Sequence, residues 1–139
     1  MPIKVTCAII EKDGKVLAAQ RSERMSHPLK WEFPGGKLHE GESPEECLVR
    51  EIREELGIDV LPFASFTSSI HHYDHISVEL IPFVCKIISG DIVLHEHSDV
   101  RWLKPEELPG LDWVEADLPV LHSYLDAQER CNPSSPGEE

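Results

Sequence analysis

Three glutamates in one short stretch of the chain have the spacing expected of a metal-binding helix face. Glu51, Glu54 and Glu55 recur at i, i+3 and i+4, which places their side chains on one side of an α-helix. Like charges at this spacing repel one another, although Arg50, four residues before Glu54, can offset part of the repulsion. Two interpretations are open: a solvated acidic helix surface, or a set of carboxylates that binds a cation.

The residues just before these glutamates favour the cation. Pro34-Gly35-Gly36 predicts a turn, and glycine allows a backbone carbonyl to approach a bound ion closely. Glu42 follows, shortly before the start of the helix. Carboxylates and a backbone carbonyl together form a hard oxygen site that suits Mg²⁺ or Mn²⁺, which keep several waters and bridge to substrate phosphates.

The helix that carries the glutamates is predicted over residues 43 to 56. Ser43 is a suitable N-cap, Pro44 suits the first helical position, and Glu46 completes a capping box. Gly57 ends the helix in the manner typical of glycine after a last turn. The apolar face of the helix consists of Leu48, Ile52 and Leu56.

Most of the remaining elements are predicted to be strands. Residues 3–11 and 15–20 alternate in the manner of strands, and Asp13-Gly14 predicts a hairpin turn between them. Pro105 begins a short acidic turn or helix. The other expected segments are a loop at 21–30, a short apolar segment at 31–33, strands near 59–70, 75–88 and 99–103, and a helix at 118–128. This order predicts an α+β fold, with one domain over residues 1–130 and a disordered tail at 131–139.

Composition limits the classes of function. The 139 residues suffice for one core, and no apolar run is long enough to span a bilayer. The N-terminus lacks a secretory pattern, so a cytoplasmic protein is expected. The net charge of −13 argues against binding of a nucleic acid polymer. Such a charge suits an enzyme acting on phosphates only if the carboxylates hold divalent cations.

Neither the cysteines nor the histidines form an evident metal motif. Cys7, Cys47, Cys85 and Cys131 lack the C-x-x-C spacing of zinc sites, and a disulfide framework is not expected without an export signal. His71, His72 and His75 cluster around Tyr73 and Asp74. A metal site is conceivable there, but exposed histidines at strand ends are the commoner arrangement.

The segment from the glycines to the end of the helix resembles a known motif. It reads Gly36-x5-Glu42-x7-Arg50-Glu51-Ile52-Arg53-Glu54-Glu55-Leu56-Gly57-Ile58 and resembles the Nudix box at each defining position. The resemblance extends over nearly the whole chain and is strongest to the MutT-like branch. It implies a mixed, curved β-sheet sandwiched between α-helices.

The resemblance also implies roles for the acidic residues. Glu51, Glu54 and Glu55 look like metal ligands, with the carbonyl of Gly36 as a further ligand. Arg50 would orient these carboxylates and Glu42 would support them. Outside the box, Glu96 lies six residues before Trp102, where similar enzymes place a metal-binding or base glutamate. An ordinary acid in a loop is the alternative for Glu96.

Substrate contacts are expected from five further residues. Arg21 and Lys37 resemble phosphate-binding positions, although exposed cations commonly serve only solubility. Phe33 and Tyr73 are candidate walls of a base pocket, although a phenylalanine taken alone is more often part of the core. Asp117 stands where MutT proteins typically have Asn. An ionised carboxylate only accepts hydrogen bonds, so it could receive them from guanine or from the cytosine amino group. Asp117 could also cap the last helix.

The resemblance therefore predicts a Mg²⁺-dependent hydrolase, with Mn²⁺ as a possible substitute. The expected reaction converts a nucleoside triphosphate to the monophosphate and pyrophosphate, with Glu51 or Glu96 as the base. The expected substrate is 8-oxo-dGTP or a related modified nucleotide. The alternatives are CTP or 5-methyl-dCTP, another nucleoside diphosphate derivative such as ADP-ribose, or a non-catalytic nucleotide sensor. A monomer or homodimer is expected, with no membrane partner.

Overall fold

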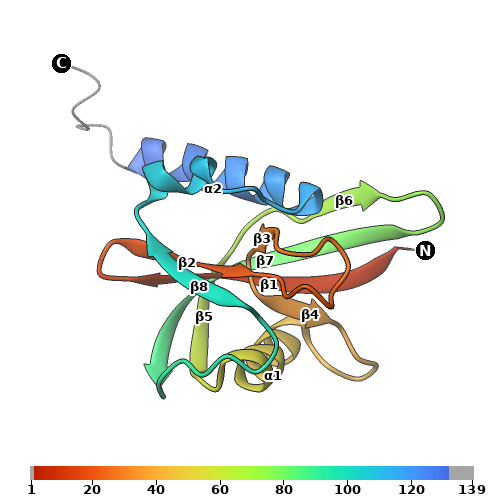
Figure 1. Ribbon diagram of the computed structural model, residues 1–139, viewed down its shortest axis with the longest axis horizontal. Helices are drawn as coiled ribbons and strands as arrows, with labels where there is room; N and C mark the ends of the chain where they lie inside the picture. Colours follow the sequence, from red (N-terminus) through yellow and green to blue (C-terminus); the bar gives the residue numbers. More distant parts are fainter. Residues whose placement is uncertain (1, 132–139) are drawn as a thin grey trace.

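A mixed β-sheet lies at the centre of the computed structural model, which describes residues 2–131 (Figure 1). Its strands are β1 (Ile3–Lys12), β2 (Lys15–Gln20), β3 (Trp31–Glu32), β4 (Gly35–Lys37), β5 (Asp59–Ser65), β6 (Ser69–His72), β7 (Ser77–Ser89) and β8 (Asp99–Leu103). The main path runs β3-β2-β1-β7-β5, while β4 pairs with β1, β6 with β7, and β8 with β2. The sheet is mixed because β1 and β7 run parallel, whereas the other pairs are antiparallel.

Two long helices cover the sheet, one on each face. In Figure 1, α1 (Pro44–Leu56) lies below the sheet and α2 (Leu118–Cys131) lies above it. Consecutive residues of β1 point to opposite faces, so Ala8 and Ile10 pack on the α1 side while Cys7 and Ile9 pack on the α2 side. The predicted α+β sandwich is therefore confirmed.

The β1–β2 hairpin and helix α1 follow the local sequence signals. Asp13 and Gly14 both have positive φ (53° and 78°), as a tight two-residue hairpin turn requires. Ser43 accepts a hydrogen bond from the Glu46 amide and the Glu46 side chain accepts one from the Ser43 amide, which forms the predicted capping box. Gly57 ends α1 in the left-handed conformation, with φ of 71°.

The predicted turn at Pro34-Gly35-Gly36 is wrong in detail. The strand structure is interrupted at Phe33 and Pro34, after which both glycines belong to β4. In β4, Gly35 pairs with Cys7 of β1 and Gly36 pairs with Thr6. Close approach, not a turn conformation, explains these glycines. A Cβ on Gly35 would lie 2.0 Å from the carbonyl oxygen of Thr6, and a Cβ on Gly36 would lie 2.2 Å from the Glu51 side chain.

Other boundaries differ modestly from the sequence expectations. The strand expected over 59–70 divides into β5 and β6. The short acidic segment at Pro105 is a 3-10 helix (Pro105–Gly110), followed by a second one at Glu115–Asp117. Residues 132–139, on which most of the predicted tail falls, lie outside the described residues. Across residues 2–131, no helix has both the length and the apolar character needed to cross a membrane.

Candidate active site

Between β4, the inner face of α1 and the loop after β7 lies an acidic cleft with a volume of about 430 Å³. It is lined by residues that are far apart in the sequence but are brought together by the pairing of β1 with β4 and β7. The predicted site residues that line it are Arg21, Phe33, Gly36, Lys37, Glu51, Glu55, Glu96 and Asp117. We refer to this feature as the carboxylate cleft.

Glu55 is the buried carboxylate of this cleft. Only 7% of its surface is exposed, and its Oε1 atom is buried without a hydrogen-bond partner among the described residues. Burial raises the pKa of Glu55 well above its usual range, and the nearby charges of Glu32, Glu51 and Glu96 raise it further. A buried carboxyl group surrounded by other acids is costly for the fold unless a cation or a proton neutralises it.

Arg50 gathers the other carboxylates of the motif. Its guanidinium donates to Glu42 at 2.6 and 3.1 Å, to Glu51 at 2.8 Å and to Glu54 at 3.3 Å. It also donates to the carbonyl of Lys37 at 3.2 Å, which ties α1 to β4. The hydrogen bond from Arg50 lowers the pKa of Glu42 to about 2, so this carboxylate stays ionised.

The three helix glutamates do not have equal surroundings. Glu51 and Glu55 line the carboxylate cleft, whereas the side chain of Glu54 is 56% exposed and faces Arg50. The i, i+4 pair of Glu51 and Glu55 thus shares the inner side of α1. Glu54 is not among the residues that line the cleft, and it would have to leave Arg50 to reach an ion there.

The loop between β7 and β8 brings Glu96 to the cleft. Backbone amides of this loop bind two carbonyl groups in the last turn of α1: Val93 N–H donates to Leu56 at 2.8 Å, and His95 N–H donates to Glu55 at 3.2 Å. These carbonyls have no partner within the helix, so the loop completes the helix end. The arrangement places Glu96 opposite the inner face of α1.

Glu32 is a cleft residue that the sequence analysis missed. Its Oε1 accepts from Arg21 at 2.7 Å, and its Oε2 lies 2.8 Å from Nε2 of His97. It stands between two buried aromatic residues in a segment interpreted as apolar. A charged residue within such a segment, next to the two glycines, was the available signal.

The two residues predicted to contact phosphate, Arg21 and Lys37, differ in whether their side chains are already hydrogen-bonded within the protein. Arg21 lines the cleft, but it already donates to Glu32 and, at 2.6 and 3.0 Å, to the carbonyl and hydroxyl of Ser26. Lys37 is exposed at the edge of the cleft, beside the carbonyl of Gly36. The geometry therefore favours Lys37 for an anion, while Arg21 holds the 21–30 loop against β3.

Asp117 and Phe33 lie together at the far side of the cleft. The Asp117 side chain is buried, and its Oδ2 accepts the backbone N–H of Phe33 at 2.8 Å. The carboxylate is thus bonded to the residue that follows β3 and does not serve as a cap of α2. Burial raises the pKa of Asp117 to about 8, and the charge of Glu32 adds to this. Phe33 is only 3% exposed and packs against Trp113 with ring centroids 4.7 Å apart, so it belongs to the core at the edge of the cleft.

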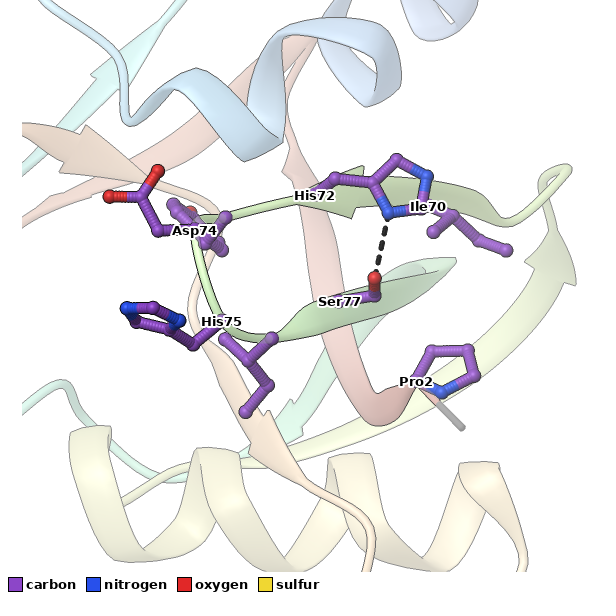
Figure 2. Close-up of a pocket in the computed structure, with 8 residues that line it drawn as sticks. Pro2, Ile70, His72, Asp74, His75 and Ser77 are labelled. Atoms are coloured by element: carbon purple, nitrogen blue, oxygen red, sulfur yellow. Dashed lines mark hydrogen bonds between the residues drawn. The ribbon is translucent and has the colours of Figure 1, made fainter.

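Tyr73 and the histidine cluster lie in a separate hollow. Tyr73 contacts His71 and His27, with ring centroids 4.5 and 5.8 Å apart, and all three line a hollow of about 610 Å³. Figure 2 shows His72 turned toward Ser77, to which its Nδ1 is hydrogen-bonded at 2.7 Å, with His75 directed away from it. His71 lies 3.4 Å from Glu115 instead, and no three ligand-type side chains gather at this hollow among residues 2–131.

The donor chemistry of the cleft fits a divalent cation. No three ligand-type side chains among residues 2–131 converge on one point, and Arg50 engages the carboxylates of Glu42, Glu51 and Glu54. The unpartnered Oε1 of buried Glu55 nevertheless lies among further acids, an arrangement that an ion with oxygen ligands would satisfy. Mg²⁺ and Mn²⁺ match these hard oxygen donors.

An acidic cleft beside a capped helix suits an enzyme that acts on phosphates together with a divalent cation. Residues 1–124 match the family model of the NUDIX domain, and the chain belongs to the Nudix family. It is a hydrolase, and the resemblance drawn from the motif is confirmed.

Relatives and solved structures agree with this assignment. The chain is 37% identical over 123 residues to the CTP pyrophosphohydrolase of Escherichia coli (strain K12), covering 88% of this chain and 91% of that protein. It is 42% identical over 65 residues to the 8-oxo-dGTP diphosphatase of Proteus vulgaris, covering 47% of this chain and 58% of that protein. The solution structure of MutT from methicillin-resistant Staphylococcus aureus 252 has a TM-score of 0.74 at 40% identity, covering 91% and 98% of the two chains.

Proposed function

We propose that the protein hydrolyses a nucleoside triphosphate to the monophosphate and pyrophosphate with the help of Mg²⁺. The observation that carries the proposal is the buried Oε1 atom of Glu55, which has no hydrogen-bond partner among the described residues, in a cleft that also contains Glu51 and Glu96. A buried carboxylate is costly for the fold unless a cation or a proton neutralises it, and a cleft of about 430 Å³ leaves room for a nucleotide beside it. The pyrophosphohydrolase among the relatives supports the reaction.

The carbonyl of Gly36 and the carboxylates of Glu51, Glu54, Glu55 and Glu96 would hold the metal. When bound, such ions neutralise phosphate charge and lower the pKa of a coordinated water. Glu51 or Glu96 would accept the proton of the attacking water at a carboxylate oxygen. Arg50 would keep the carboxylates oriented through the hydrogen bonds described above, and Lys37 would contact a phosphate oxygen as a point charge.

Asp117 is proposed to contact the base through Oδ1, because Oδ2 is occupied by the Phe33 amide. In the neutral form favoured by its raised pKa, this carboxyl can donate to O6 of a guanine or to N3 of a cytosine. In the ionised form it accepts from guanine N1–H or from the cytosine amino group. Phe33 would flank the base, whereas Tyr73 lines the separate hollow and would reach the base only from there.

Two substrates remain within the proposal. The primary one is 8-oxo-dGTP or a related modified nucleotide, which the MutT-like motif and the Proteus vulgaris relative support. The second is CTP or 5-methyl-dCTP. It is favoured by the Escherichia coli relative, which matches this chain over a much larger share of its length. An acidic residue at position 117 is compatible with either base.

A substrate panel with Mg²⁺ tests the proposal through pyrophosphate release. The panel contains 8-oxo-dGTP, dGTP, CTP, dCTP, 5-methyl-dCTP and ADP-ribose. A Glu54→Gln variant should lose activity, whereas Glu45→Gln, an exposed glutamate in the first turn of the same helix, should not. Release of orthophosphate alone would refute the reaction. Nucleotide binding without turnover would support a sensor, and turnover of ADP-ribose alone would indicate another diphosphate substrate.

We further propose that one domain over residues 1–130 carries the activity and acts on free nucleotides as a monomer or homodimer in the cytoplasm. A net charge of −13 supports free nucleotides over a nucleic acid polymer, because polymer binding requires a basic face. The acidic cleft itself would accept a nucleotide only together with cations.

A further inference from the structure

The loop that carries Glu96 is irregular and largely exposed. It covers residues 90–98, and every other residue in it is at least partly exposed, whereas His97 is buried with its side chain fully inaccessible. Three backbone hydrogen bonds attach the loop to α1 and β2, the last from Ser98 N–H to the carbonyl of Gln20 at 2.9 Å. Besides these, His97 provides the side-chain attachment next to Glu96.

The imidazole of His97 is joined to the floor of the cleft. Its Nε2 lies 2.8 Å from Oε2 of Glu32, a residue 65 positions away in the sequence. A carboxylate only accepts hydrogen bonds, so Nε2 carries the proton and donates. Nδ1 is buried without a partner among the described residues, so the link to Glu32 is the hydrogen bond that orients the ring.

Glu32 is itself fixed from the other side. Arg21 donates to Oε1 at 2.7 Å, so the carboxylate joins a residue at the end of β2 to the loop after β7. The side chains of Arg21 and Glu32 are only 19% and 16% exposed, which shields this network from water. A shielded hydrogen bond to a charged group is stronger than an exposed one and holds its partners in one geometry.

We propose that His97 is a positioning residue that holds Glu96 over the carboxylate cleft by hydrogen bonding to Glu32. This inference rests on the proposed function, because Glu96 matters there as a metal ligand or base. Without the imidazole donor, the backbone bonds of His95 and Ser98 still attach the loop on either side of Glu96, but no side chain of the loop links it to Glu32 in the cleft. Glu96 would then occupy its working position for only part of the time.

Two substitutions separate the hydrogen bond from the bulk of the ring. In His97→Gln, the amide nitrogen can occupy nearly the place of Nε2 and donate to Glu32. In His97→Asn, the amide is shorter and reaches only the place of Nδ1. His95→Asn is the matched control, because His95 lies in the same loop with an exposed side chain and contributes its backbone amide alone.

The measurements are Mn²⁺ binding by electron paramagnetic resonance without nucleotide, kcat and KM for pyrophosphate release, and hydrogen exchange of the loop amides. Partners that orient metal ligands typically contribute a factor of about 10 to 100, so His97→Asn should lower Mn²⁺ affinity and kcat by that factor. With Mg²⁺ at a saturating concentration, KM should stay nearly unchanged, because the phosphate and base contacts remain. The amides of Val93, His95 and Ser98 should exchange faster.

The conservative variant decides between a hydrogen bond and simple packing. His97→Gln should recover most of the affinity and kcat, and His95→Asn should match the wild type. Wild-type affinity and kcat in His97→Asn, or equal losses in His97→Asn and His97→Gln, would overturn the inference. If the wild type released no pyrophosphate from any nucleotide, the proposed function would fail, while Mn²⁺ binding and hydrogen exchange would still decide the role of His97.

Discussion

Adding one methyl group at Gly36 should disable the site while leaving the fold intact. A Cβ at this position would lie 2.2 Å from Cδ and 2.3 Å from Oε1 of Glu51, whereas ordinary contacts begin at 3.4 Å. The Glu51 carboxylate must therefore retreat by more than about 1 Å, because β4 is held by its pairing with β1. A displacement of about 1 Å in a catalytic arrangement can reduce the rate by about 100-fold.

The cost to stability should be smaller than the cost to activity. The end of the Glu51 side chain is flexible, so Gly36→Ala should cost at most about 1 to 3 kcal/mol of unfolding free energy, as overpacking typically does. The assay pairs pyrophosphate release, which should lose about 100-fold in kcat/KM, with urea unfolding. Gly110→Ala is the control, because a Cβ there meets no atom within 4 Å.

At Gly35, in contrast, an added methyl group would collide with the backbone of β1 and not with a side chain. A Cβ on Gly35 would lie 2.0 Å from the backbone oxygen of Thr6, which cannot move without separating β1 from β4. Gly35→Ala should therefore reduce stability more than Gly36→Ala does. Wild-type kcat/KM in Gly36→Ala would refute the placement of Glu51 in the working site, and equal unfolding free energies for the two variants would refute the distinction between backbone and side-chain contact.

Three further substitutions test the burial and capping arguments. The folded pKa of Glu55 lies above the unfolded value near 4.5, so this residue costs stability increasingly as pH rises above about 4.5. Glu55→Gln should then melt higher than the wild type at pH 8 with EDTA, and Mg²⁺ should no longer raise its melting temperature. Asp117→Asn keeps a donor at all pH values. If the neutral carboxyl binds the base, the wild-type KM should rise as pH passes about 8, while that of Asp117→Asn stays constant in steady-state assays. Ser43→Ala removes the N-cap of α1 and should cost about 1 kcal/mol in urea unfolding without changing kcat/KM.

The sequence predicted those parts of the fold that depend on local signals. The capping box at Ser43, the left-handed Gly57 and the Asp13-Gly14 turn each involve neighbouring residues, and the structure confirms them. The glycines of β4 were assigned to a turn, although the actual reason for each is a close contact with a distant element: the Thr6 backbone in β1 for Gly35 and the Glu51 side chain in α1 for Gly36. Close approach between elements that are distant in the sequence leaves no local pattern that distinguishes it from a turn.

The site, too, was predicted where it depends on local spacing and missed where it depends on contacts between distant residues. The i, i+3, i+4 rule grouped three glutamates, but the rule does not state which of them faces a buried cleft. The structure buries Glu55 and leaves Glu54 exposed beside Arg50. Glu32 and His97 were missed because they meet only when β3 and the β7–β8 loop are in place, at a sequence separation of 65. Neither residue has a spacing that relates it to the motif.

The charge balance of the cleft links stability to the proposed chemistry. Five acidic side chains line it (Glu32, Glu51, Glu55, Glu96 and Asp117), against the two cations Arg21 and Lys37. Arg21 is already bonded to Glu32, so a triphosphate entering alone would meet a surplus of like charge. Divalent cations reverse the sign of the local field and satisfy the buried carboxylate in the same step. The feature that weakens the metal-free fold is therefore the feature that would make nucleotide binding depend on the metal.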